Sequence, residues 1–166
     1  MSATDDLIAN AQRHAESFGS GHLTNQPSLG VAVVTCMDSR IDVAGLLGLN
    51  EGDAHVVRNA GGVVTDEEIR SLSISQHLLG TREIMVIRHT DCGLLTFTDE
   101  DFNAKLVAET GKLPEWRAGT FSDLEEGVRE SLEIIAASPF IPVKESIRGF
   151  IYDVATGAFG EVAPAA

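Results

Sequence analysis

The chain has few of the residues that build disulfide-rich or membrane-spanning proteins. Its 166 residues include two cysteines, one tryptophan and one tyrosine. Two cysteines cannot form a disulfide framework, so a reducing cytoplasm is the expected compartment. No apolar run approaches the roughly 20 residues that a membrane helix needs. The N-terminus also lacks the basic start and apolar centre of a signal peptide, so no membrane association is expected.

Basic residues are scarce as well. Twelve lysines and arginines stand against 25 acidic residues, and the formal net charge is -13. This balance makes nucleic acid and anionic membranes unsuitable partners. Apolar residues make up 43% of the chain and charged residues 22%, which is typical of a globular domain rather than a disordered one. The length suits one domain, and no internal repeat or linker suggests a second.

Predicted strands alternate with predicted helices along the chain. Strands are expected from residue 31 and over 54–59, 83–88 and 147–155, and helices over 4–18, 41–49, 65–79, 98–109 and 122–137. This alternation predicts an α/β fold with a mostly parallel central β-sheet flanked by helices, plus an N-terminal helix. We divide the single domain (1–166) into an N-terminal helical arm (1–29), a metal-binding core (30–157) and a tail (158–166).

A cysteine, a carboxylate and a guanidinium follow the first predicted strand in the run Cys36-Met-Asp38-Ser-Arg40. The carboxyl ends of parallel strands are where open α/β sheets place their ligands. Cys36 and Asp38 share one side of an extended chain, and Arg40 is close enough to hold Asp38 ionised and oriented. The alternative is a buried structural cysteine followed by a surface ion pair.

The run His89-Thr-Asp-Cys92-Gly93 follows another predicted strand, so His89 and Cys92 can converge on Cys36. Two thiolates and one imidazole form a zinc set, and three protein ligands leave a fourth position for water. Asp38 can then accept the hydrogen bond of a zinc-bound hydroxide, or coordinate the zinc itself and close the site. Without a metal, the same residues are two buried cysteines and a core histidine.

Other candidates are weaker. His55 and His77 suit proton relays, but also ordinary half-buried positions on a strand and a helix. Arg58 and Asn59 end the second predicted strand, where they line the same crevice or only anchor a turn. Asp91, between the two later ligands, is either a solvated or capping carboxylate or a catalytic one.

The motifs taken together resemble those of the β-class carbonic anhydrases. They are Cys36-Met-Asp38-Ser-Arg40, Arg58-Asn59-Ala-Gly61, His89-Thr-Asp-Cys92-Gly93 and Tyr152-Asp-Val-Ala-Thr-Gly157. The resemblance implies one Zn²⁺ per chain on Cys36, His89 and Cys92, a catalytic Asp38–Arg40 dyad, and Gly93, Asn59 and Gly61 around the substrate. Where many members have glycine before the ligand histidine, this chain has Arg88, which puts a cation near the metal.

The implied activity is the reversible hydration of carbon dioxide to bicarbonate and a proton, through attack of a zinc-bound hydroxide. The resemblance also implies a homodimer or a larger homo-oligomer, with the N-terminal helix reaching over the neighbour. The compact members also resemble hydrolases of carbonyl sulfide and carbon disulfide, so that activity at the same site is the enzymatic alternative. The non-enzymatic alternative is a zinc- or thiol-based binding or redox-sensing module.

Overall fold

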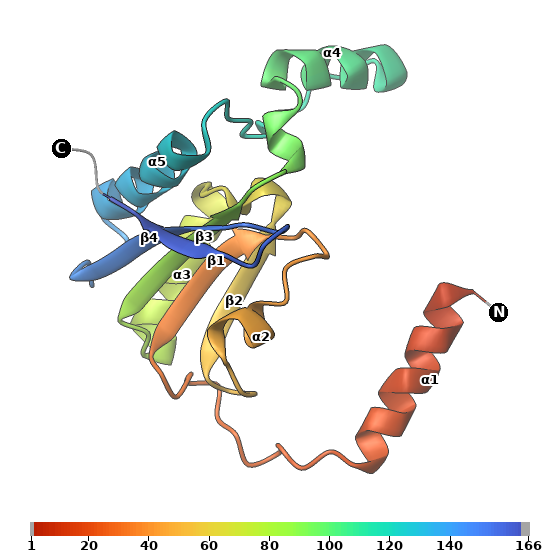
Figure 1. Cartoon of the computed structure of the whole chain (residues 1–166), viewed down its shortest axis with the longest axis vertical. Coiled ribbons are helices and arrows are strands. Elements are labelled where there is room, and N and C mark those ends of the chain that lie inside the picture. Colours follow the sequence, from red (N-terminus) through yellow and green to blue (C-terminus); the bar gives the residue numbers. More distant parts are fainter. Residues whose placement is uncertain (1, 164–166) are drawn as a thin grey trace.

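A five-stranded sheet forms the centre of the chain, of which the computed structural model describes residues 2–163 (Figure 1). In chain order the elements are α1 (Ala3–Glu16), β1 (Val31–Cys36), α2 (Val43–Leu47), β2 (Ala54–Asn59), η1 (Ala60–Gly62), α3 (Asp66–Leu79), β3 (Glu83–His89), η2 (Gly93–Leu95), α4 (Asp99–Thr110), α5 (Leu124–Ala137), β4 (Ser146–Tyr152) and β5 (Phe159–Val162). The sheet order is β2-β1-β3-β4-β5, with β1 to β4 parallel and β5 antiparallel to β4. The predicted α/β fold with a mostly parallel sheet is confirmed.

The two faces of the sheet are covered by different elements. Alternate residues of β1 and β3 pack on one face against α3 and α5; this core includes Ala32, Val34, Ile84, Val86, Leu72 and Ile135. The other face packs against α2 and η2, and this second core includes Val33, Ile87, Val43, Leu94, Cys36 and Cys92. The two predicted cysteine ligands are therefore part of a hydrophobic core, which keeps bulk water away from them.

Local signals set the ends of α3 as predicted. Thr65 caps its N-terminus and forms a capping box with Glu68, and Gly80 ends it in the left-handed conformation with φ of 80°. In α5 the cap is Asp123, which accepts a hydrogen bond from the Glu126 amide, so the helix predicted over 122–137 begins at Leu124. Both helices return the chain to the start of the next parallel strand, which is why the strand ends gather on one edge.

The C-terminal region differs from the prediction. The strand expected to run to residue 155 ends at Tyr152, because Asp153 and Gly157 form the turn that leads into β5. The segment predicted as a tail (158–166) contains β5, whose Val162 is buried against the sheet. A four-residue edge strand with three exposed positions carries too weak an apolar pattern to be recognised. Residues 164–166 of that predicted tail lie outside the described residues.

Helix α1 stands apart from the sheet at the end of a long connection (Figure 1). It has no buried residue, and the apolar side chains Leu7 and Ile8 are 65% and 52% exposed. An amphipathic helix gains most of its stability from packing its apolar face, so this face requires a partner surface. Within residues 2–163, no helix has both the length and the apolar character needed to cross a membrane.

Candidate metal centre

The ends of β1 and β3 place the predicted ligands together. Cys36 is the last residue of β1 and His89 the last of β3, and these strands are parallel neighbours. Cys92 lies three residues beyond His89 and turns back towards the same edge. The two thiol sulfurs and a ring nitrogen of His89 lie within 4.8 Å of one another, and all three residues are buried. Ligand atoms of a tetrahedral zinc site are about 4 Å apart, so the cluster is close to that geometry.

The His89 ring is oriented for metal binding. Its Nδ1 lies 2.8 Å from the Thr90 carbonyl oxygen, which can only accept, so Nδ1 carries the proton. Nε2 then presents its lone pair, and it is buried with no hydrogen-bond partner. An unpaired buried nitrogen is costly unless something binds it. Burial also lowers the pKa of His89, which keeps the ring in the neutral form that ligates metals.

The two thiols complete a donor set for a borderline-soft divalent cation. Cys36 Sγ accepts a hydrogen bond of 3.3 Å from the Gly61 amide, a contact common to sulfur atoms that carry negative charge. Burial raises the pKa of Cys92, since a lone thiolate in this core is unfavourable. A bound cation would favour the thiolate form instead. Two thiolates and one imidazole therefore form a donor set that fits a metal ion.

Two glycines after β2 bring the backbone against β1. A Cβ on Gly62 would lie 2.9 Å from the Cys36 amide nitrogen, and its φ of 61° is left-handed. A Cβ on Gly61 would lie 2.4 Å from a methyl carbon of Leu94. The φ of Gly61 is also left-handed, at 81°, so glycine suits the backbone that brings this amide to the Cys36 sulfur. A Cβ on Gly93 would meet no atom of the chain within 4 Å.

Asp38 and Arg40 form the predicted dyad. The Arg40 guanidinium donates from Nε to Asp38 Oδ1 at 3.0 Å and from Nη2 to Oδ2 at 2.7 Å, and the Arg40 amide donates to Oδ1 at 2.9 Å. These hydrogen bonds hold the pKa of Asp38 well below its usual range. Asp38 Oδ2 also lies 3.9 Å from Nε2 of His89. An ionised acceptor therefore faces the fourth side of the ligand cluster.

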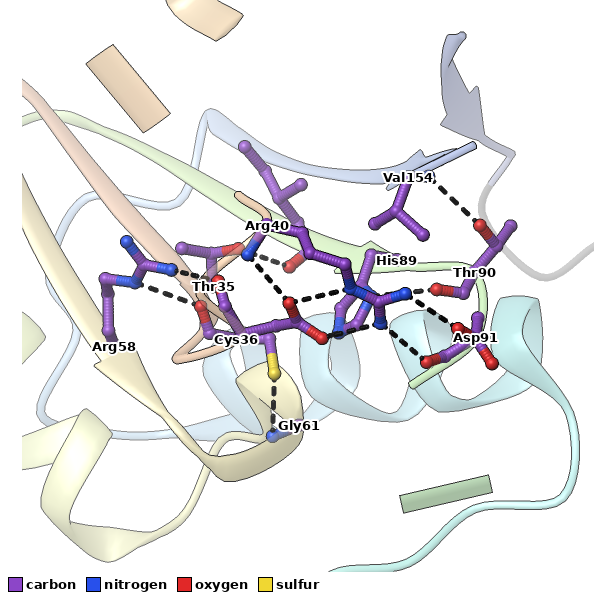
Figure 2. A network of polar contacts seen from close by, with 11 residues as sticks. Thr35, Cys36, Arg40, Arg58, Gly61, His89, Thr90, Asp91 and Val154 are labelled. Atoms are coloured by element: carbon purple, nitrogen blue, oxygen red, sulfur yellow. Dashed lines mark hydrogen bonds and ion pairs between the residues drawn. The ribbon is translucent and has the colours of Figure 1, made fainter. Parts of the chain in front are cut away.

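Asp91 binds the same guanidinium from the other side (Figure 2). Arg40 Nη1 donates to Asp91 Oδ2 at 2.7 Å, and Nη2 donates to the Asp91 carbonyl oxygen at 3.0 Å. Arg40 thus joins the loop after β1 to the loop after β3. Of the two readings left open for Asp91, solvated or catalytic, the structure favours neither: its carboxylate is exposed yet bonded to the dyad.

Arg58 and Asn59 stabilise the turns beside the site. Arg58 donates to the carbonyl oxygens of Cys36 and Asp38 at 3.0 and 2.7 Å. The Asn59 amide group brackets Val63, donating to its carbonyl oxygen and accepting from its amide. Both side chains therefore anchor turns, which is one of the two roles predicted for them. Asn59 also borders an apolar cavity of about 450 Å³ with Leu94 and Phe97.

Arg88 is the unusual neighbour of the cluster. Its side chain is 3% exposed, donates from Nη2 to Ser131 Oγ at 3.0 Å, and stacks over Phe121 with 4.1 Å between the guanidinium carbon and the ring centroid. Nε and Nη1 are buried without a partner. Burial lowers the pKa of Arg88 to about 10, partly offset by Glu130, Cys92 and Cys36. It remains a cation at neutral pH, as the sequence suggested.

The remaining predicted histidines lie away from the cluster. His55 is near the amino-terminal end of β2, where its Nδ1 contacts Ser75 Oγ at 2.7 Å, and His77 is exposed on α3. Neither is placed to relay protons from the site.

The sequence alone did not predict that Asp91 is the second partner of Arg40. Its position next to Cys92 was the only available signal.

Comparison with known proteins agrees with this geometry. The family model described as carbonic anhydrase matches residues 31–159. β-Carbonic anhydrase 1 of Mycobacterium tuberculosis is 53% identical over 99% of this chain and 100% of its own length. The solved carbonic anhydrase of Streptococcus mutans is 48% identical, covers 98% of this chain and 99% of its own, and superposes with a TM-score of 0.91. A carbon disulfide hydrolase of an Acidianus strain is 36% identical over 75% of this chain and 72% of its own.

The family model covers β1 to β4 with both ligand-bearing loops, and the match to the mycobacterial protein covers 99% of the chain. They argue against a mere binding or redox module, because the matched relatives carry the names of enzymes. The fold, the Cys36–His89–Cys92 cluster and the matched relatives lead to one conclusion: the chain belongs to the β-carbonic anhydrase family.

Proposed function

We propose that this protein catalyses the reversible hydration of carbon dioxide to bicarbonate and a proton, with one Zn²⁺ per chain. The observation that carries the proposal is the ionised Asp38, held by Arg40, 3.9 Å from the unpaired Nε2 of His89 in a buried Cys-His-Cys cluster. The 53% identity to a β-carbonic anhydrase over its full length supports the substrate.

Zinc is the metal that best suits the donor set. Cys36, Cys92 and His89 would hold it, since two thiolates and an imidazole are common zinc ligands and leave one open position. Zinc bound there would supply a Lewis acid that makes a water molecule acidic enough to become a nucleophile at moderate pH. The two thiolates offset its charge, so this effect is smaller than at a site of three neutral histidines.

The chain's own residues would orient the reaction. Asp38 Oδ2 accepts the hydrogen of the attacking oxygen nucleophile and so directs its lone pair towards the carbon of the substrate. Arg40 keeps Asp38 ionised and away from the metal position. We propose that Gly61, Asn59 and Gly93 line the substrate side, with Gly61 also donating to the Cys36 sulfur. The second core excludes bulk water behind the ligands.

The test combines metal content with stopped-flow carbon dioxide hydration on one preparation. About one zinc per chain and turnover that chelation abolishes and zinc restores are expected. A zinc-loaded protein that leaves the hydration rate at the uncatalysed level would contradict the proposal.

A second candidate is hydrolysis of carbonyl sulfide or carbon disulfide at the same site. It is favoured by the 36% identity to a carbon disulfide hydrolase. All three substrates are small, linear and electrophilic at carbon, so the same nucleophile can attack each. Carbon dioxide remains preferred because the match to the β-carbonic anhydrase is both closer and longer.

We further propose a cytoplasmic homodimer or larger homo-oligomer. The exposed apolar face of α1, with Leu7 and Ile8 uncovered, supports association with a second copy. Two free cysteines that serve as metal ligands suit a reducing compartment. The domain division also stands as a proposal, with residues 1–29 as the arm and 30–157 as the metal-binding core.

A further inference from the structure

Arg40 is held by two carboxylates rather than by one. Four of its five N–H groups have partners: Nε and Nη2 donate to Asp38, Nη1 to the Asp91 carboxylate, and the second N–H of Nη2 to the Asp91 carbonyl. The planar fork of arginine therefore has one orientation that satisfies both neighbours. The two carboxylates come from loops after different strands, so the contact is tertiary and not a local turn.

The loop that carries Asp91 is fixed on its other side. The Thr90 amide donates to the Tyr152 carbonyl oxygen at 3.0 Å, and the Val154 amide donates to Thr90 Oγ1 at 3.1 Å. These bonds tie the loop to the end of β4, as Figure 2 shows for Thr90 and Val154. Asp91 is thus presented to Arg40 by a backbone anchored at the sheet.

The backbone of Asp91 is itself unusual. Its φ of 55° is left-handed, and among residues 2–163 no other non-glycine residue has a positive φ. Asparagine and glycine adopt this conformation at least as readily as aspartate. The conformation alone therefore does not call for a carboxylate, whereas the ion pair with Arg40 does.

From these contacts we propose that Asp91 is a positioning residue for the reaction: it anchors Arg40 so that Arg40 holds Asp38 in its acceptor orientation and off the metal. The expected change in kcat rests on the proposed function, whereas the expected change in the Asp38–Arg40 pair does not. If Asp91 loses its carboxylate, the backbone carbonyl is the only contact that remains between Arg40 and residue 91. Arg40 is then held less firmly, and Asp38 gains freedom to turn towards His89 Nε2, which is 3.9 Å away.

The test compares the wild type with Asp91→Gly and Asp91→Asn. Asp91→Gly removes the carboxylate while accepting the left-handed backbone, so its melting temperature should not fall. Because the Asp91 side chain is 78% exposed, its ion pair is modest, and kcat should drop about fivefold with KM nearly unchanged. Asp91→Asn retains a neutral acceptor for Arg40 and should restore kcat to within about twofold of the wild type.

A matched control is Glu161→Ala, which removes the exposed pair of Arg148 and Glu161 on β4 and β5. It should leave kcat unchanged.

Crystal structures of the zinc-loaded wild type and Asp91→Gly give a readout independent of activity: Asp38 should leave Arg40 in the variant. Unchanged kcat, a change in KM alone, or an unaltered Asp38–Arg40 pair would overturn the proposal. If the wild type itself does not hydrate carbon dioxide, the proposed function fails, and the crystal structures alone decide the role of Asp91.

Discussion

Asp38 Oδ2 lies 3.9 Å from Nε2 of His89, although Asp38 follows β1 and His89 ends β3. The distance exceeds a hydrogen bond, so the carboxylate does not satisfy the histidine nitrogen. A metal ion can therefore bind this nitrogen together with the sulfurs of Cys36 and Cys92. The same geometry brings the proposed acceptor, Asp38, next to the reacting oxygen.

Replacing Asp38 with asparagine should preserve metal content and reduce turnover about 10²-fold or more, as expected for loss of a positioned acceptor. The amide can donate to the nucleophile and misdirect its lone pair. Arg40→Ala should act in the same direction but less completely. Stopped-flow hydration with zinc analysis measures both, and Asp53→Asn, at the amino-terminal edge of the sheet, is the control. Normal turnover in Asp38→Asn would make the dyad purely structural.

Cys36→Ser, His89→Ala and Cys92→Ser should each lose zinc and activity, because three ligands leave no reserve donor in the buried cluster. Elemental analysis after dialysis measures the metal. The exposed His77 offers a matched control, since His77→Ala should retain full zinc. Stoichiometric zinc in all three ligand variants would show that the ligands are assigned wrongly.

Arg88→Met should keep or raise the melting temperature, because Nε and Nη1 of Arg88 are buried without partners and the apolar stem is retained. The pKa of Arg88 is lowered to about 10 by burial, so the variant loses a positive charge at neutral pH. A nearby cation favours the ionised form of an acid. The pH at which turnover reaches half its maximum should therefore rise in the variant. An unmoved pH profile would limit Arg88 to packing.

The full chain should be a dimer or larger at micromolar concentration, and Leu7→Glu with Ile8→Glu should shift it towards monomer. Both side chains are exposed on the apolar face of α1, where charges would oppose burial against a second copy. Light scattering after size exclusion measures the mass. Gln12→Glu, on the same helix but outside its apolar face, is the control. A wild type that runs as a stable 17.7 kDa monomer contradicts this prediction.

Catalytic efficiency on carbon dioxide should exceed that on carbonyl sulfide. A pocket that discriminates by shape separates close analogues by only about 1–3 kcal/mol, so some carbonyl sulfide turnover is expected. Both gases are compared with one enzyme batch, and Asp38→Asn should lose both activities together if they share the site. A higher kcat/KM for carbonyl sulfide would make the second candidate the main function.

Much of the site followed from local pattern. The apolar run before Cys36 and the one before His89 predicted buried strands, and alternation with helices predicted that those strands are parallel. Parallel strands end on one edge of the sheet, so the two ligands could converge there, with Cys92 close behind. The dyad needed only the two-residue spacing of Asp38 and Arg40. These relations depend on sequence distance and strand direction alone.

Other features depend on side-chain rotamers and on loops far apart in the chain, which no local pattern encodes. Asp91 meets Arg40 only because the loop after β3 is tied to β4. The tautomer of His89 depends on which carbonyl faces its ring, and the burial of Arg88 on Phe121 and α5. The strand β5 is stabilised by pairing with β4 and not by its own weak apolar pattern, so only the tertiary structure distinguished it from a tail.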